Sequence, residues 1–150
     1  MDHFSVSKFS ISAAVGVISA FSTYIFGEWS NDVFALIILM VIDFIMGILL
    51  AIVFQKSSKS KKGGLSSTAA WKGIAKKTCT MLLVAVAYQA DILLSTAYIR
   101  PTVVGALCAS EIISIVENAA KMGILPEPVQ KLLNKVIDIL NVPKGDGGND

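Results

Sequence analysis

Four carboxylates lie in or beside the most apolar stretches of this 150-residue chain: Asp43, Asp91, Glu111 and Glu117. Asp43 stands in the middle of LMVIDFIMGILLAI, residues 39–52, which otherwise reads as a lipid-soluble helix. An aspartate at the centre of a bilayer costs about 2.5 to 3.5 kcal/mol, so Asp43 is not expected to face lipid. We expect these acids to meet other protein groups, a cavity or a path for water.

The chemistry open to these acids depends on what neutralises them. No lysine or arginine falls inside the apolar stretches that carry them. We therefore expect no basic partner at membrane depth within one chain. Three possibilities then remain: the carboxyl groups are protonated, they hydrogen bond to neighbours, or they line water.

Spacing places the acids on helix faces that also carry small or polar residues, because residues three or four apart share one face. The faces are Asp43, Gly47 and Ala51; Ala87, Asp91 and Ser95; and Glu111, Ser114 and Asn118, with Glu117 beside the last. Small residues let helices approach closely in lipid, so these faces are candidate helix interfaces, or pore linings if several copies surround water. The simpler alternative is that the acids cap or staple helices within a monomer, which suits Asp91 and Glu117, nearest the helix ends.

The rest of the sequence shows little sign of a catalytic or metal-binding site. His3 is the only histidine, so one chain cannot assemble a Ser-His-Asp triad or a histidine-based metal site. Cys79 and Cys108 lie in apolar surroundings without C-x-x-C spacing, as expected for buried, inert thiols. KKGGLSS, residues 61–67, lacks the Gly-Lys-Ser/Thr ending of a P-loop. We expect no enzyme and no bound metal, cofactor or nucleic acid.

The composition predicts helices that cross a membrane. Hydrophobic residues make up 54% of the chain, and its mean hydropathy is +0.68. Segment 33–54 offers about 22 residues with a single charge, enough at ~1.5 Å per residue to cross a ~30 Å hydrocarbon core. Further spans are expected at 11–27, 78–97 and 101–116. The predicted fold class is all-α, an integral membrane protein of about four transmembrane helices plus interfacial amphipathic helices.

Two of these spans leave alternatives open. Segment 11–27 could be a signal peptide, although Asp2 and the lack of an A-x-A cleavage site argue against it. Segment 101–116 contains Glu111, so it could instead be a tilted helix that lines water or an interfacial segment. A topology with three spans follows if either segment stays at the interface.

A dense group of lysines sets the expected orientation. The group consists of seven lysines: Lys56, Lys59, Lys61, Lys62, Lys72, Lys76 and Lys77. We expect 55–64 to form a flexible basic loop and 65–77 an amphipathic helix lying on anionic lipid headgroups. With four spans, every basic residue except Arg100 falls on one side, which the positive-inside rule assigns to the cytoplasm. The prediction is a multi-pass protein of the bacterial inner membrane with both termini in the cytoplasm.

At the C-terminal end, apolar residues recur at helical spacing between positions 129 and 140. A helix of roughly 14 residues, about 21 Å long, is too short to span a bilayer. We expect a membrane domain at 1–126, then an amphipathic helix at 127–141 that lies on the membrane or pairs with another copy. The polar tail at 142–150 is predicted to be disordered.

Three stretches together resemble one known family. They are MVIDFIMGILLA with its D-x-x-x-G, the lysine loop leading into LSSTAAWKGIAKK, and SEIISIVENAAKMGILPEPVQKLL. In this order, and over most of the chain, they are similar to the bacteriophage holin family, which includes pneumococcal phage holins and clostridial toxin-secretion holins.

This resemblance implies a small membrane protein of a phage or prophage that forms homo-oligomers and opens lesions, through which an endolysin or toxin reaches the cell wall. The endolysin or toxin need not bind it directly. By position, the matches are Asp43 and Gly47 in D-x-x-x-G; Lys72, Gly73, Lys76 and Lys77 in K-G-x-x-K-K; and Glu117 with Asn118 in E-N. Two positions depart from the family pattern: Phe44 stands where tyrosine is common, and Ser110 where asparagine is expected.

Two functions from different classes are therefore weighed. Faces of small and acidic residues suit reversible clustering in lipid, as lysis by a holin requires. The alternative is a small membrane transporter or channel subunit whose intramembrane carboxylates bind a cation. The chain has no inverted repeat, which gives that alternative little support.

Overall fold

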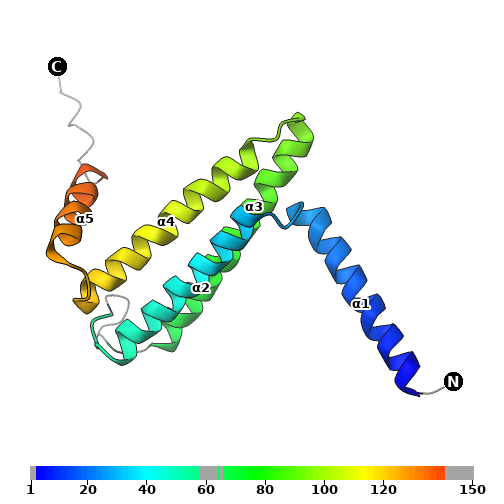
Figure 1. Cartoon of the computed structure of the whole chain (residues 1–150), viewed down its shortest axis with the longest axis horizontal. Coiled ribbons are helices and arrows are strands. Elements are labelled where there is room, and N and C mark those ends of the chain that lie inside the picture. The colour runs from blue at the N-terminus through cyan, green and yellow to red at the C-terminus, as the bar shows by residue number, and fades with distance from the viewer. Residues whose placement is uncertain (1–2, 58–63, 65, 141–150) are drawn as a thin grey trace.

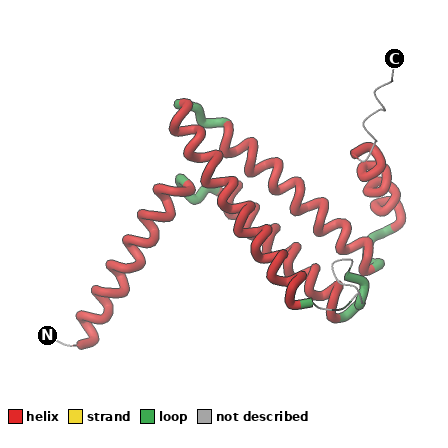
Figure 2. Tube along the Cα trace, turned by 180° about the vertical axis from the view of Figure 1, so that it is seen from behind, coloured by secondary structure: helices red, strands yellow, loops and turns green. Residues whose placement is uncertain are grey.

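The computed structural model describes residues 3–57, 64 and 66–140, with the side chains of all but residues 3–7, 133, 134 and 136–140. The helices of this part are α1 (His3–Phe26), α2 (Asn31–Ile52), α3 (Ser67–Leu94), α4 (Ile99–Met122) and α5 (Glu127–Leu140). Four of them, α1 to α4, are long and apolar enough to cross a membrane. Figure 2 shows no strand in the described part, so the predicted all-α fold with about four membrane-length helices is confirmed.

Helices α2, α3 and α4 run side by side as a bundle, and α1 leaves it at an angle (Figure 1). Helix α4 packs extensively against both α2 and α3, whereas α2 and α3 touch each other much less. Helix α1 contacts α3, and α5 contacts α4. The bundle is therefore centred on α4, with a looser seam between α2 and α3.

Local signals in the sequence end the helices. The hydroxyl of Ser66 accepts a hydrogen bond from the backbone N–H of Ala69 at 3.5 Å and caps the start of α3. Helix α3 ends where Ser95 adopts a left-handed conformation with φ of 52°. Helix α4 ends at Gly123, with φ of 79°, a conformation that glycine adopts at little cost.

The third predicted span and the amphipathic helix predicted before it form a single element. Helix α3 has 28 residues, a length of about 42 Å, and runs without a break through Lys72 and Lys76. Lysine is a good helix former and no proline interrupts the segment, so nothing ends a helix between 65–77 and 78–97. The prediction of two separate elements is wrong. Helix α4 likewise extends beyond the predicted 101–116 at both ends.

An apolar cluster fills the half of the bundle nearest the turn between α3 and α4. Its members are Val33, Leu36 and Met40 of α2, Val84 of α3 and Val104 of α4, all at most 8% exposed. They recur at spacings of three and four along α2, the pattern of a helix that buries one face. The other half of the bundle, toward residues 53–66, holds the polar groups described below.

The exit of α1 from the bundle is fixed by its last turn. The side-chain amide of Gln89 on α3 donates hydrogen bonds to the carbonyl oxygens of Tyr24 and Ile25, at 3.1 and 3.3 Å. Gly27 then turns the chain with φ of 78°, and the ring of Tyr88 packs directly against it. In the part of α1 that leads away from this turn toward the N-terminus, apolar side chains are exposed, as for Phe9 at 77%. These side chains are available to lipid.

Replacing Gly27 with alanine should destabilise the fold. The added Cβ would lie 2.5 Å from the Tyr88 ring, and the left-handed backbone alone costs a residue with a side chain about 1 to 2 kcal/mol. Chemical unfolding in mild detergent measures the loss. The matched control is Gly16→Ala in α1, where a Cβ meets nothing within 4 Å and no loss is expected. Equal stability of the two variants would contradict this role for Gly27.

Two further predictions concern the C-terminal part. Helix α5 occupies most of the predicted amphipathic segment 127–141, whereas the division into a membrane domain at 1–126 and a separate helix stays a prediction. The predicted disordered tail at 142–150 lies outside the described residues, as do Lys59, Lys61 and Lys62 of the basic loop.

Candidate functional site

Lys77 joins two carboxylates in the middle of the bundle. Its Nζ lies 2.9 Å from Oδ2 of Asp43 on α2 and 2.6 Å from Oε2 of Glu111 on α4. The side chains of Lys77, Asp43 and Glu111 are 16%, 11% and 8% exposed. We call these three residues the ion-pair cluster. Since each lies well inside its helix, the cluster sits near the mid-depth of the bundle.

Asp43 is held through its second oxygen as well. Its Oδ1 accepts hydrogen bonds from Oγ of Ser114 at 2.7 Å and from Nδ2 of Asn118 at 3.1 Å. Ser114 and Asn118 lie three and seven residues after Glu111, so one face of α4 supplies all three groups. The polar face predicted on the fourth span therefore meets the Asp43 face of the second span within one chain.

The expectation that no basic residue reaches these acids is wrong, and Lys77 is the residue that corrects it. The sequence predicts Lys77 as a basic group on the membrane surface, because the apolar stretch of the third span begins at residue 78. In the structure α3 begins eleven residues earlier, at Ser67, and Lys77 turns inward. A charged pair with added hydrogen bonds satisfies carboxylates away from water without lipid contact.

A pattern in the sequence marks Lys77 as inward-facing. Spacings of four and three residues give one face of α3, made of Gly73, Lys77, Thr80, Val84, Ala87 and Asp91. Thr80, Val84, Ala87 and Asp91 are all buried. The Thr80 hydroxyl donates to the carbonyl of Lys76, which satisfies it inside the helix. Extending the Ala87 and Asp91 face by three turns toward the N-terminus would have found Lys77.

The ion-pair cluster sets two carboxylates against one ammonium group in a poorly polarisable interior. Coulomb attraction is strong there, but so is the cost of removing charges from water, and the two terms offset each other only while every partner is present. Because the three charges come from three helices, α2, α3 and α4 are tied together at one point. The seam between α2 and α3, where packing is loose, depends most on this contact.

A partly open cavity of about 90 Å³ lies beside the cluster. Small residues make room for it on two walls, Gly47 and Ala51 on α2 and Ala69, Ala70 and Gly73 on α3. Its polar lining comes from the ion-pair cluster, Lys76, Ser110 and Ser114, with Ser57, Gly64 and Ser66 between α2 and α3. A Cβ built at Gly47 would meet nothing within 4 Å, so this glycine opens space rather than close helix contact within the chain.

Asp91 serves as a cap for α4 instead of joining the cluster. Its carboxylate accepts hydrogen bonds from the backbone N–H groups of Ile99 at 3.0 Å and Arg100 at 2.8 Å. The Thr96 hydroxyl donates to the same side chain. The first turn of a helix has no internal partners for its N–H groups, and a carboxylate there also suits the helix dipole. The alternative of a capping acid is thus confirmed for Asp91, and Ser95 of its predicted face lies past the helix end.

Arg100 fastens the connector between α1 and α2 to the same end of the bundle. Its guanidinium donates to the carbonyl of Glu28 and, at 2.9 Å, to the hydroxyl of Ser30. It also lies over the ring of Tyr88, 5.7 Å from the centroid, as in a cation–π contact. Arg100, which the charge pattern had separated from all other basic residues, is a structural tie.

The remaining predicted residues lie outside the ion-pair cluster. Glu117 is half-buried one position before Asn118, and no described contact joins it to Asp43 or Lys77. Lys56, Lys72 and Lys76 are exposed near the ends of α2 and α3 that carry the basic loop. Pore-lining by the acidic faces and lipid binding by these lysines stay predictions.

Long apolar helices and a charged cluster enclosed between them define a helical membrane protein. The model of the bacteriophage holin family matches residues 20–142, and the chain belongs to that family. It is not an enzyme family. The suspected resemblance is confirmed, and the match covers the ion-pair cluster together with α2 to α5.

Bacterial relatives match over most of their length. An uncharacterized protein of Listeria innocua is 37% identical over 124 residues, 82% of this chain and 81% of the relative. One of Listeria monocytogenes is 38% identical over 112 residues, 73% and 74% of the two chains. One of Halalkalibacterium halodurans is 32% identical over 139 residues, 89% and 93%. No solved structure matches the chain significantly.

Proposed function

We propose that this protein is a holin that assembles into homo-oligomers in the bacterial cytoplasmic membrane and opens lesions that release an endolysin or a toxin. The observation that carries the proposal is the ion-pair cluster. It stores three charged groups and two further polar side chains, Ser114 and Asn118, near mid-depth of a bundle whose outside is apolar. A lesion needs a membrane protein with polar side chains that can line water, and the enclosed cluster supplies such side chains.

In the proposed mechanism the monomer keeps its polar groups sealed between α2, α3 and α4. Helices in lipid associate through packing and polar pairing, since lipid tails are as apolar as the helix surfaces. At high local density, α2 and α3 separate along their loose seam, and the polar faces exchange their partners for water. Copies arranged side by side then line an aqueous lesion with the residues of the ion-pair cluster.

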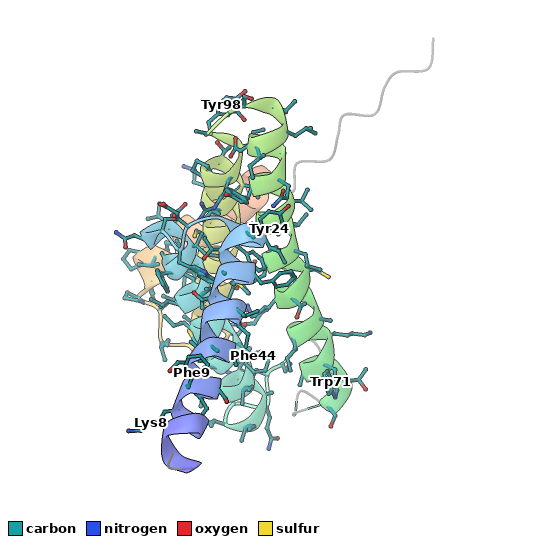
Figure 3. All side chains as sticks on the ribbon, turned by 90° about the vertical axis from the view of Figure 1, so that its right-hand side faces the viewer. Lys8, Phe9, Tyr24, Phe44, Trp71 and Tyr98 are labelled. Atoms are coloured by element: carbon teal, nitrogen blue, oxygen red, sulfur yellow. The ribbon has the colours of Figure 1, made fainter. Side chains whose placement is uncertain are left out.

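The proposed orientation places both termini and the basic loop in the cytoplasm. Figure 3 supports the placement of the basic loop, because Trp71, near the start of α3, lies toward one end of the bundle and Tyr98, two residues before Arg100, lies at the other. Lys56, Lys72 and Lys76 then face the anionic headgroups of the inner leaflet, where each lysine near the surface contributes about 1 kcal/mol of attraction. The exposed Trp71 sits at the same level, as expected of an interfacial aromatic.

Replacing Asp43 with leucine should disturb the timing of lysis. The substitution removes one acid from Lys77 and the acceptor from Ser114 and Asn118, so the sealed monomer is weakened and lysis should begin earlier at matched protein level. Inducible expression with a co-expressed endolysin, followed by culture turbidity and crosslinking of oligomers, provides the measurement. Ile42→Leu, a neighbouring change on the exposed face of α2, should behave as wild type. Unchanged lysis timing and oligomerisation in Asp43→Leu would refute the role assigned to this residue.

The cavity beside two carboxylates favours a second candidate, a small cation channel or transporter subunit. The two functions separate in one assay. A holin depolarises the membrane abruptly and releases cytoplasmic endolysin, whereas a channel or transporter gives a graded, saturable cation flux and retains the enzyme. Release of active endolysin in step with depolarisation supports the holin.

A further inference from the structure

The cavity beside the ion-pair cluster is partly open, and its lining reaches from the cluster to the segment that joins α2 and α3. Ser57, Gly64, Ser66 and Lys76 line the cavity near the end of α2 and the start of α3, which we call its basic-loop side. Its floor is the ion-pair cluster, near mid-depth of the bundle. Beyond the floor, Met40, Leu36 and Val84 are at most 8% exposed and belong to the apolar cluster.

The room in this cavity comes from missing side chains on facing walls. A Cβ at Gly47 meets nothing within 4 Å, and one at Gly73 meets only the Phe44 ring, at 3.7 and 3.8 Å. The cavity therefore has space for small molecules on both its α2 and α3 walls. Its volume of about 90 Å³ is enough for several waters, provided that polar partners line it.

Those polar partners are present. Glu111 is only 6% exposed and lines the cavity, and the one hydrogen bond described for it is the bond from Lys77 to Oε2. Its other oxygen has no hydrogen-bond partner among the described residues. Ser110, Ser114 and Lys76 also line this space and carry further donors and acceptors. A carboxylate oxygen that lines a cavity without a protein partner is satisfied by water or by a small cation.

We propose that this cavity is a one-sided aqueous vestibule, through which water and small hydrophilic cations reach Glu111 and Asp43 from the basic-loop side before any lesion opens. The apolar cluster of Leu36, Met40 and Val84 seals the opposite side. The proposal rests on the proposed function only for naming the basic-loop side as cytoplasmic. It adds that the two acids are in contact with one aqueous compartment while the bundle is intact.

Thiol labelling of the full-length protein in membranes tests this vestibule. Single cysteines are placed at Gly47 and at Gly73, on facing walls, after Cys79→Ser and Cys108→Ala. A membrane-impermeant cationic methanethiosulfonate is applied to inverted vesicles and, separately, to spheroplasts, before lysis begins. Gly47→Cys and Gly73→Cys should react in inverted vesicles about tenfold or more faster than in spheroplasts, since thiol modification follows access to water. Leu36→Cys, in the apolar seal, is the matched control and should resist labelling from both sides.

Each outcome decides the proposal. One-sided labelling of either glycine position, with Leu36→Cys protected, supports the vestibule, so a variant that fails to accumulate is replaced by the other. Protection of Gly47→Cys and Gly73→Cys to the level of Leu36→Cys overturns it, as does equal labelling from both sides. Labelling is read before lysis and without an endolysin, so failure of the vestibule is distinct from failure of the holin function, which endolysin release reports.

Discussion

Replacing Lys77 with methionine should destabilise the bundle by about 3 to 5 kcal/mol, the usual cost of removing one partner from a buried ion pair. Methionine keeps the length of the side chain, but it leaves Asp43 and Glu111 without the ammonium group that lies 2.9 and 2.6 Å from them. The seam between α2 and α3 has little other packing to compensate. Reversible unfolding in mixed micelles, followed by circular dichroism, measures the loss.

Two comparisons make this prediction specific to charge. Lys72→Met, a change at an exposed site five residues earlier on α3, should cost less than about 1 kcal/mol. Combining Lys77→Met with Asp43→Asn and Glu111→Gln removes all three charges and should restore most of the lost stability, because neutral replacements of buried ion pairs are often tolerated. If Lys77→Met unfolds no more easily than Lys72→Met, the cluster does not hold the bundle together. If the triple variant stays as unstable as Lys77→Met, the loss comes from packing and not from charge.

Replacing Asp91 with alanine should be the next most damaging change. It removes the acceptor from two backbone N–H groups at the start of α4 and from the Thr96 hydroxyl, and it frees the turn that carries Arg100. We expect the thermal midpoint in detergent to fall by about 5 °C or more, as for the loss of a helix cap. Hydrogen exchange should rise first at Ile99 and Arg100.

The contrast with other substitutions identifies the capping role of Asp91. Asp91→Asn retains one acceptor oxygen and should recover part of the lost midpoint. Glu117→Gln, a change of charge alone at a half-buried acid outside the cluster, should leave both the midpoint and the exchange at Ile99 unchanged. Fast exchange spread evenly along α4 in Asp91→Ala would speak against a local cap.

The spans were the most predictable part of this protein. Twenty or so apolar residues admit few structures other than a membrane helix, so 33–54 gave α2 within two residues at each end. The acidic faces were also predictable in part, since Asp43, Ser114 and Asn118 share helix faces by spacing and meet in the structure. Spacing within each helix could not say which faces meet, because that depends on how the helices turn about one another.

Lys77 was missed because hydropathy sets span boundaries by composition. A lysine close to Lys72 and Lys76 is interpreted as surface charge, yet its long apolar stem and its position on the Val84 and Asp91 face carry it inward. The angle at which α1 leaves the bundle was not predictable from the sequence either. It follows from one glycine turn, the Tyr88 ring and the Gln89 amide, none of which has a strong pattern in the sequence.

The spacing of the ion-pair cluster along the chain bears on how the protein is made. Lys77 lies 34 residues from Asp43 and 34 from Glu111, so the three charges leave the ribosome one at a time and at equal intervals. When α3 enters the membrane, Lys77 can pair only with Asp43, which still lacks Ser114 and Asn118 as donors. The last helix of the bundle thus supplies the remaining hydrogen-bond donors to Asp43 and the second carboxylate on Lys77, and a chain cut short after α3 lacks both.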